Sequence, residues 1–191
     1  MDSAAKHRTS QHSNEGLRSN SQLTPWDIKF LKLALHIATW SKDQSSKVGC
    51  VIVGPDNEVR STGYNGFPRG ANDGVASRYS RPDKYLWTEH AERNAIYNAA
   101  RAGISLDGCS MYLPWFPCVD CARAVVQTGI RVLVAAVPDW NDEQWGTHFR
   151  VAKELFDEVG IQLRLFDIDQ LNSDWYEVAA VRTPGEVERA K

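Results

Sequence analysis

Three glycines divide the second half of the chain into helix-then-strand units, and this alternation constrains the fold more than any other feature. Each glycine ends a run that favours a helix and is followed by a short apolar run that favours a strand. The helical runs are residues 90–103, 118–129 and 147–160, which end at Gly103, Gly129 and Gly160, and the strands are residues 108–114, 130–137 and 161–167. This alternation predicts a central sheet with helices packed on it.

The first half of the chain predicts a helix followed by a β-hairpin. Thr24 is a suitable N-cap, Pro25 and Asp27 suit the first turn, and apolar residues then recur at helical spacing for about four turns. The runs "VGCVIV" and "EVRSTGY" predict two strands around the turn "PDN". Residues 65–87 form a loop rich in Gly, Pro, Asn and Asp, and its length favours a functional role.

The two ends of the chain differ from this central part. Residues 1–22 are polar and nearly free of large apolar side chains, so we expect a disordered arm. Residues 23–167 have the length of one ordinary domain. Residues 168–191 give no clear pattern, but Trp175 and Tyr176 favour docking on the domain or on a neighbouring subunit.

Charge and composition narrow the classes of partner. The formal net charge is -2 and no run is rich in Lys and Arg, which argues against a nucleic-acid polymer as partner. A single nucleotide needs only one or two cations, so it stays possible as a substrate. The chain shows no secretion signal and no apolar run near 18 residues, so we expect a cytoplasmic protein with no membrane partner.

A cysteine pair in "PWFPCVDC" (114–121) follows the triplet "HAE" (90–92). The pair could be a redox pair, part of a structural zinc site completed by His148 or Cys109, or part of a catalytic zinc site. Both Cys118 and Cys121 open a predicted helix, where the helix dipole favours the thiolate that binds zinc. With His90 they make three ligands and leave one position for water, which is the catalytic pattern. We therefore predict one catalytic Zn²⁺ per chain, with Cys50 and Cys109 as inert strand residues.

Glu92 favours a catalytic role for the metal. Position i+2 of a regular helix points away from position i, but a ligand at the helix cap lies outside the regular turn. With His90 at the cap, Glu92 can take a proton from a water at the open position and return it to the substrate. The pattern H-x-E…P-C-x-x-C marks the zinc nucleobase deaminases, in which the Glu carries the proton and is not a ligand.

Six segments together resemble the deoxycytidylate (dCMP) deaminases of the cytidine deaminase superfamily, from about Trp26 to Asp167. They are "SKDQSSKVG" (41–49), "GYNGFPRG" (63–70), "HAERNAI" (90–96), "GCSMY" (108–112), "FPCVDCA" (116–122) and "QTGI" (127–130). The zinc triplet and cysteine pair are common to the superfamily, whereas "GYNG-x-P-x-G" is narrower and favours the dCMP branch. The resemblance implies an α/β fold, a three-layer α/β/α sandwich with a five-stranded mixed sheet. It also implies the zinc-dependent hydrolysis of dCMP to dUMP and ammonia.

The resemblance also implies roles for residues around the base. Water activated by zinc would attack C4 of cytosine, while Glu92 would protonate N3 and help the amine to leave. The backbone N–H of Ala91 would hold the base carbonyl, and the backbone carbonyl of Phe116 would accept from the leaving amine. Asn65 matches the asparagine that usually contacts the sugar.

The substrate phosphate needs cations, and the sequence offers two. Lys42, preceded by Ser41, matches a recurring "SK" of the family, and Arg69 lies in the loop near Asn65. A solvated lysine and arginine are the alternative interpretation of both. Tyr85 approaches the site from the loop, where it would stack on the base or pack in the core, and Trp115 would wall the pocket.

Three departures from the resemblance leave the substrate open. Glu89 stands where many relatives carry Cys and adds a negative charge beside the zinc site, and Trp40 replaces a frequent Arg. The 65–87 loop has no Cys or His, so we expect no second metal.

The alternatives are a zinc deaminase of another nucleotide or base (modified dCMP, dCTP, a nucleoside or guanine) and a non-catalytic nucleotide-binding zinc protein. A non-catalytic protein would not need Glu92. The resemblance further implies a homo-oligomer, a hexamer or dimer, with dCTP and dTTP as candidate regulators.

Overall fold

A computed structural model describes residues 23–168, so the predicted arm over 1–22 and nearly all of the predicted 168–191 extension lie outside the described residues. The elements in chain order are α1 (Pro25–Ala38), β1 (Gly49–Val53), β2 (Val59–Tyr64), η2 (Ala76–Tyr79), α2 (Lys84–Trp87), α3 (Ala91–Ala102), β3 (Ser110–Leu113), α4 (Val119–Gln127), β4 (Val132–Ala136), α5 (Gly146–Val159) and β5 (Gln162–Phe166). Every predicted helix and strand is present. Residues 65–87, predicted as loop, contain the short helices η2 and α2.

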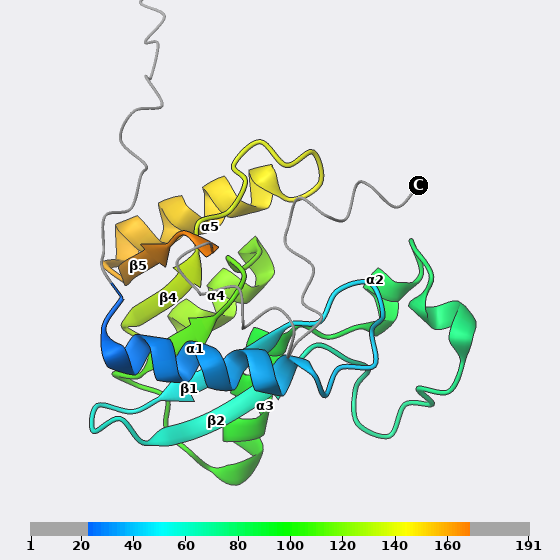
Figure 1. Cartoon of the computed structure of the whole chain (residues 1–191), viewed down its shortest axis with the longest axis horizontal. Coiled ribbons are helices and arrows are strands. Elements are labelled where there is room, and N and C mark those ends of the chain that lie inside the picture. The colour runs from blue at the N-terminus through cyan, green and yellow to red at the C-terminus, as the bar shows by residue number, and fades with distance from the viewer. Residues whose placement is uncertain (1–22, 169–191) are drawn as a thin grey trace, which may run out of the picture.

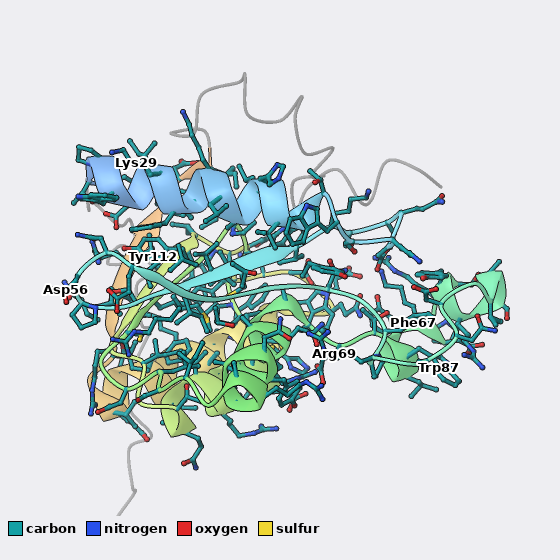
Figure 2. The ribbon with its side chains drawn as sticks, turned by 90° about the horizontal axis from the view of Figure 1, so that it is seen from below. Lys29, Asp56, Phe67, Arg69, Trp87 and Tyr112 are labelled. Atoms are coloured by element: carbon teal, nitrogen blue, oxygen red, sulfur yellow. The ribbon has the colours of Figure 1, made fainter. Side chains whose placement is uncertain are left out.

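The strands form one mixed sheet in the order β2-β1-β3-β4-β5. β1 is antiparallel to both β2 and β3, whereas β3, β4 and β5 are parallel. Helix α1 covers one face of the sheet, and α3, α4 and α5 cover the other (Figures 1 and 2). This arrangement confirms the predicted three-layer α/β/α sandwich.

Each face of the sheet has its own apolar core. Successive strand residues point to opposite faces: Val51 and Val53 pack with α1, whereas Cys50 and Ile52 pack with the residues of α3, α4 and α5. Because both faces of β1 are covered, its sequence is a continuous apolar run and does not alternate with polar residues.

Helix α1 begins as the sequence predicts. The hydroxyl of Thr24 accepts the backbone N–H of Asp27 at 3.1 Å, and the Asp27 carboxylate accepts the N–H of Thr24 at 2.9 Å. Asp27 also accepts two hydrogen bonds of 3.0 Å from Arg164 on β5. The cap of α1 is therefore joined to the edge strand at the far end of the chain.

Gly63 on β2 lets helix α3 lie directly on the sheet. A Cβ at Gly63 would lie 2.3 Å from the backbone nitrogen of Ala95 and 2.4 Å from the carbonyl oxygen of Ala91, both on α3. Real Cβ atoms do not approach backbone that closely, so a larger residue here would push α3 away. The need for glycine at position 63 matters because α3 carries Glu92.

Replacing Gly63 by Ala is therefore expected to lower the free energy of unfolding by about 1–3 kcal/mol, the usual cost of overpacking. We also expect a lower kcat, because α3 must shift. Gly66→Ala is the matched control, since its Cβ would meet nothing closer than the Tyr64 ring at 3.6 Å. Denaturant unfolding of both variants checks the prediction, and equal midpoints would contradict it.

Candidate active site

Both helices of the site begin at a cysteine or histidine. His90 is the N-cap of α3 and Cys118 is the N-cap of α4, and both have extended backbone angles (φ -77°, ψ 154° and φ -68°, ψ 167°). Cys121 lies in the first turn of α4. His90 therefore stands outside the regular helical turn, which removes the objection that Glu92, two residues later, would point away from it.

These three residues form a compact group of metal-binding atoms. Nδ1 of His90 lies 3.6 Å from Sγ of Cys118 and 3.5 Å from Sγ of Cys121. A tetrahedral zinc ion with ordinary Zn–S and Zn–N distances separates its nitrogen and sulfur ligands by about 3.6 Å. The donor set therefore fits Zn²⁺. Within residues 23–168 no other group of three such ligands lies as close together.

Among the described residues the group has no fourth protein ligand, which a structural zinc site would need. His148 and Cys109, the two residues that the sequence offered for that position, are both absent from the cluster of His90, Cys118 and Cys121. Three protein ligands with one position left for water are typical of catalytic zinc.

The hydrogen bond between the two cysteines shifts their pKa values in opposite directions. Hydrogen bonding from Cys121 lowers the pKa of Cys118 to about 3, against the opposing effect of burial, and His90 lowers it further. The same hydrogen bond, together with burial, raises the pKa of Cys121. Zinc binding takes both cysteines as thiolates.

Glu92 lies at the second position of α3 with only 5% of its surface exposed. Burial raises the pKa of its carboxyl group, while His90 acts in the opposite direction. A raised pKa moves a carboxyl group toward neutral pH, where a proton carrier is most effective. Glu92 is not a member of the three-ligand group, as expected of a residue that carries the proton.

A cavity opens beside Glu92 and the ligands. Its lining residues are Asp43, Ser46, Val48, Asn65, Arg81, Lys84, Tyr85, Thr88, His90, Ala91, Glu92, Trp115, Cys118, Trp145 and Phe149. The cavity therefore brings together four of the residues predicted to touch substrate: Asn65, Tyr85, Ala91 and Trp115.

Trp145 forms a wall of this cavity that sequence reasoning missed. Its ring centroid lies 6.1 Å from that of His90 and 6.2 Å from that of Tyr85. Trp145 precedes α5, more than fifty residues beyond His90 in the chain, and no local pattern marks it.

Asn65 and Ser41 form part of the cavity's supporting structure. The side-chain oxygen of Asn65 accepts the N–H of Val48 at 2.8 Å, and its amide donates to the carbonyl of Ser46 at 2.8 Å. The Ser41 hydroxyl donates to the carbonyl of Asn65 at 2.7 Å, and Ser41 does not line the cavity. Ser41, predicted to bind substrate, is thus buried behind Asn65.

Phe116 packs into the core. Its ring makes edge contacts with Trp140, Phe149 and Phe156, at centroid distances of 5.6–6.2 Å. Phe116 is not among the cavity-lining residues. The role of its backbone carbonyl toward the leaving amine stays a prediction.

Lys42 and Arg69, the predicted phosphate cations, line a different cavity. Lys42 is exposed and pairs with Asp73 at 2.7 Å, and Arg69 donates a hydrogen bond to Asn98. This second cavity is lined by Trp40, Lys42, Tyr64, Gly66, Phe67, Arg69, Asp73, Tyr79, Asn94 and Asn98. Figure 2 shows Arg69 and Phe67 on the same side of the molecule, where the 65–87 segment leaves the sheet.

Two other cations, Lys84 and Arg81, line the cavity of Glu92. Lys84 is 5% exposed, and its Nζ lies 2.9 Å from the Asp43 carboxylate and 2.5 Å from the Ser45 hydroxyl. Burial raises the pKa of Asp43, but hydrogen bonds from Lys84 and Ser45 outweigh it and the net pKa is lowered. The pair is therefore ionic, and it joins the 65–87 segment to the chain before β1.

No helix within residues 23–168 is both long and apolar enough to cross a lipid bilayer.

The fold, the three-ligand group and the buried Glu92 beside it define a zinc-dependent deaminase. Residues 24–137 match the family described as the cytidine and deoxycytidylate deaminase zinc-binding region. The chain belongs to this family.

Known relatives agree with this assignment. The chain is 34% identical over 162 residues to human deoxycytidylate deaminase, a match that covers 78% of this chain and 88% of the human protein. It is 36% identical over 152 residues to an uncharacterised deaminase of Aliivibrio fischeri, covering 78% of this chain and 99% of that protein. The apo crystal structure of dCMP deaminase from cyanophage S-TIM5 has the same fold, with a TM-score of 0.60 and 21% identity, over 75% of this chain and all of that one.

Proposed function

We propose that this protein hydrolyses dCMP to dUMP and ammonia. The observation that carries the proposal is a buried Glu92 in a cavity that also contains His90 and Cys118, two of the three zinc ligands. Relatives named deoxycytidylate deaminase share about a third of the sequence over most of its length, which supports dCMP over other cytosine compounds.

Each of these residues has a separate role in the proposed reaction. His90, Cys118 and Cys121 would hold Zn²⁺, which would supply a water that is nucleophilic at neutral pH. Glu92 would take the proton from the water that attacks C4 of cytosine and deliver it to N3. It would then assist the 4-amino group to leave C4 as ammonia. The N–H of Ala91 is in the first turn of α3, where backbone donors have no intrahelical partner, so it is available to hold the base carbonyl.

For the phosphate we propose Arg81 and Lys84 in place of Lys42 and Arg69. Both line the cavity that contains Glu92, whereas the other two line the second cavity. Since Asp43 offsets the charge of Lys84, Arg81 supplies the larger attraction for an anion.

Arg81→Gln is therefore expected to raise KM for dCMP by roughly 10- to 100-fold, the value of a hydrogen bond to a charged group. KM for deoxycytidine, which has no phosphate, should change little. Arg69→Gln is the matched control, and steady-state kinetics on both substrates checks the prediction. A raised KM in Arg69→Gln with an unchanged Arg81→Gln would restore the assignment made from sequence.

Ammonia release from a panel of compounds tests the substrate itself. The panel is dCMP, CMP, deoxycytidine, dCTP, 5-methyl-dCMP and guanine, and dCMP should give the highest kcat/KM. Another preferred compound would favour a different zinc deaminase. No turnover of any compound by zinc-loaded protein would favour the non-catalytic nucleotide-binding alternative.

We further propose a cytoplasmic homo-oligomer, a hexamer or dimer, that is regulated by dCTP and dTTP. Large apolar side chains are exposed on the single chain, including Trp26, Trp40, Leu86 and Tyr97. The second cavity, with Lys42, Arg69 and several aromatic rings, has the chemistry to hold a second phosphorylated ligand. Light scattering measures the assembly, and dCMP kinetics with added dCTP or dTTP measure the regulation.

A further inference from the structure

Glu89, the residue before the first zinc ligand, has a built set of partners. Its Oε1 accepts the backbone N–H of His90 at 2.9 Å and Nε of Arg93 at 2.6 Å, and Nη2 of Arg93 makes a further contact with the same oxygen. Both side chains are about four-fifths buried. One carboxylate oxygen thus joins the backbone of a zinc ligand to a side chain one turn further along α3.

The backbone of Glu89 is fixed as well. Its N–H donates to the carbonyl of Gly66 at 2.8 Å, and its carbonyl accepts from the N–H of Gly66 at 3.0 Å. His90 therefore follows a residue that is held on one side by the segment after β2 and on the other by α3. These contacts fix the backbone from which the His90 imidazole extends toward the two sulfurs.

Arg93 lies beside the ligand group. It does not line the Glu92 cavity, but with His90 and Cys118 it lines an adjoining cavity. Arg93 is therefore placed to act on the ligand residues and not on a substrate in the Glu92 cavity.

Charge gives a reason for the pair. A largely buried carboxylate is costly without a cationic partner. Arg93 is that partner for Glu89 and keeps its oxygen directed at the N–H of His90.

We propose that Glu89 and Arg93 are positioning residues for zinc, which act as a unit to hold His90 ready for the metal. Outer residues of this kind typically change metal affinity by about 10- to 100-fold when they are removed. The inference concerns the metal site, so it stands whichever nucleotide is the substrate. The competing interpretation is an ordinary ion pair across the start of α3, worth about 0.2–1 kcal/mol of stability and nothing for zinc.

Zinc release distinguishes the two. We expect Glu89→Ala and Arg93→Gln each to lose zinc to excess EDTA about 10-fold faster or more than the unsubstituted protein. The double variant should lose zinc no faster than the worse single variant, because the two residues act as one unit. Lys153→Gln, which breaks the exposed i,i+4 pair Lys153–Asp157 on α5, is the matched control and should release zinc at the original rate.

One further variant and one spectrum complete the test. Glu89→Gln keeps an acceptor oxygen for His90 and Arg93, so it should release zinc within about threefold of the original rate. If Glu89→Ala does not fold, Arg93→Gln carries the test. Co²⁺-substituted Arg93→Gln should show a shifted ligand-field absorption spectrum, which a change in helix stability alone would not produce. Unchanged zinc release and an unchanged cobalt spectrum in Arg93→Gln, or fast zinc release in Lys153→Gln, would overturn the proposal.

Because these readouts measure the metal, they separate this inference from the proposed reaction. Protein that holds zinc as described but does not turn over dCMP would contradict the substrate only. Protein that turns over dCMP but releases zinc normally in these variants would contradict the positioning role only.

Discussion

Replacement of Glu92 by Gln is expected to lower kcat for dCMP deamination by roughly 10²- to 10⁴-fold, the usual contribution of a positioned acid–base group. Gln has nearly the same shape as Glu, so it preserves the packing of a side chain that is only 5% exposed. It cannot accept and return a proton. Zinc content should stay near one per chain, because Glu92 is outside the ligand group.

Steady-state kinetics and metal analysis of the same preparation make this test complete. Glu154→Gln, on the exposed surface of α5, is the matched control and should keep full activity. Full turnover by zinc-loaded Glu92→Gln would show that another group moves the proton, and the mechanism would be wrong.

Replacement of Cys121 by Ser is expected to remove zinc and to reduce activity by about 10³-fold or more, because water is then no longer activated at neutral pH. A serine hydroxyl does not ionise near pH 7 and is a poor zinc ligand. The change leaves only His90 and Cys118 of the three ligands, too few to hold zinc tightly.

Cys109→Ala provides the control for this experiment. Cys109 is also fully buried, but it belongs to the core between the sheet and the helices and not to the ligand group. It should keep its zinc and its activity, at some cost in stability. If Cys121→Ser kept stoichiometric zinc, the ligand assignment would fail.

The regular elements were predictable because each has a local cause. The Thr24 cap and the glycines at 103 and 160 mark where helices begin and end. Helices η2 and α2 were missed because four residues are too few to show a period. Their positions depend on contacts such as Lys84 with Asp43, which are distant in sequence.

The difference between local causes and contacts distant in sequence also applies to the site. The zinc ligands and Glu92 lie at two helix starts, so short motifs determine their geometry. Arg81 and Lys84, the cations that we propose for the phosphate, lie in a long segment whose path depends on tertiary contacts. Lys42, expected from the sequence, lines another cavity. The Glu89–Arg93 pair was not predictable from helical spacing, because Glu89 precedes the cap of α3 and is held by a bridge to Gly66, which is distant in sequence.

The paired backbones of Gly66 and Glu89 have a consequence for how this family can diversify. They join the two ends of the 65–87 segment, which extends beyond the sheet as a loop that carries α2 and is closed at its base (Figure 1). Changes in length or composition inside a loop closed in this way do not displace the elements that flank it. Substitutions at Arg81, Lys84 or Tyr85, which line the Glu92 cavity from this segment, can therefore reshape the cavity while the start of α3 keeps its position.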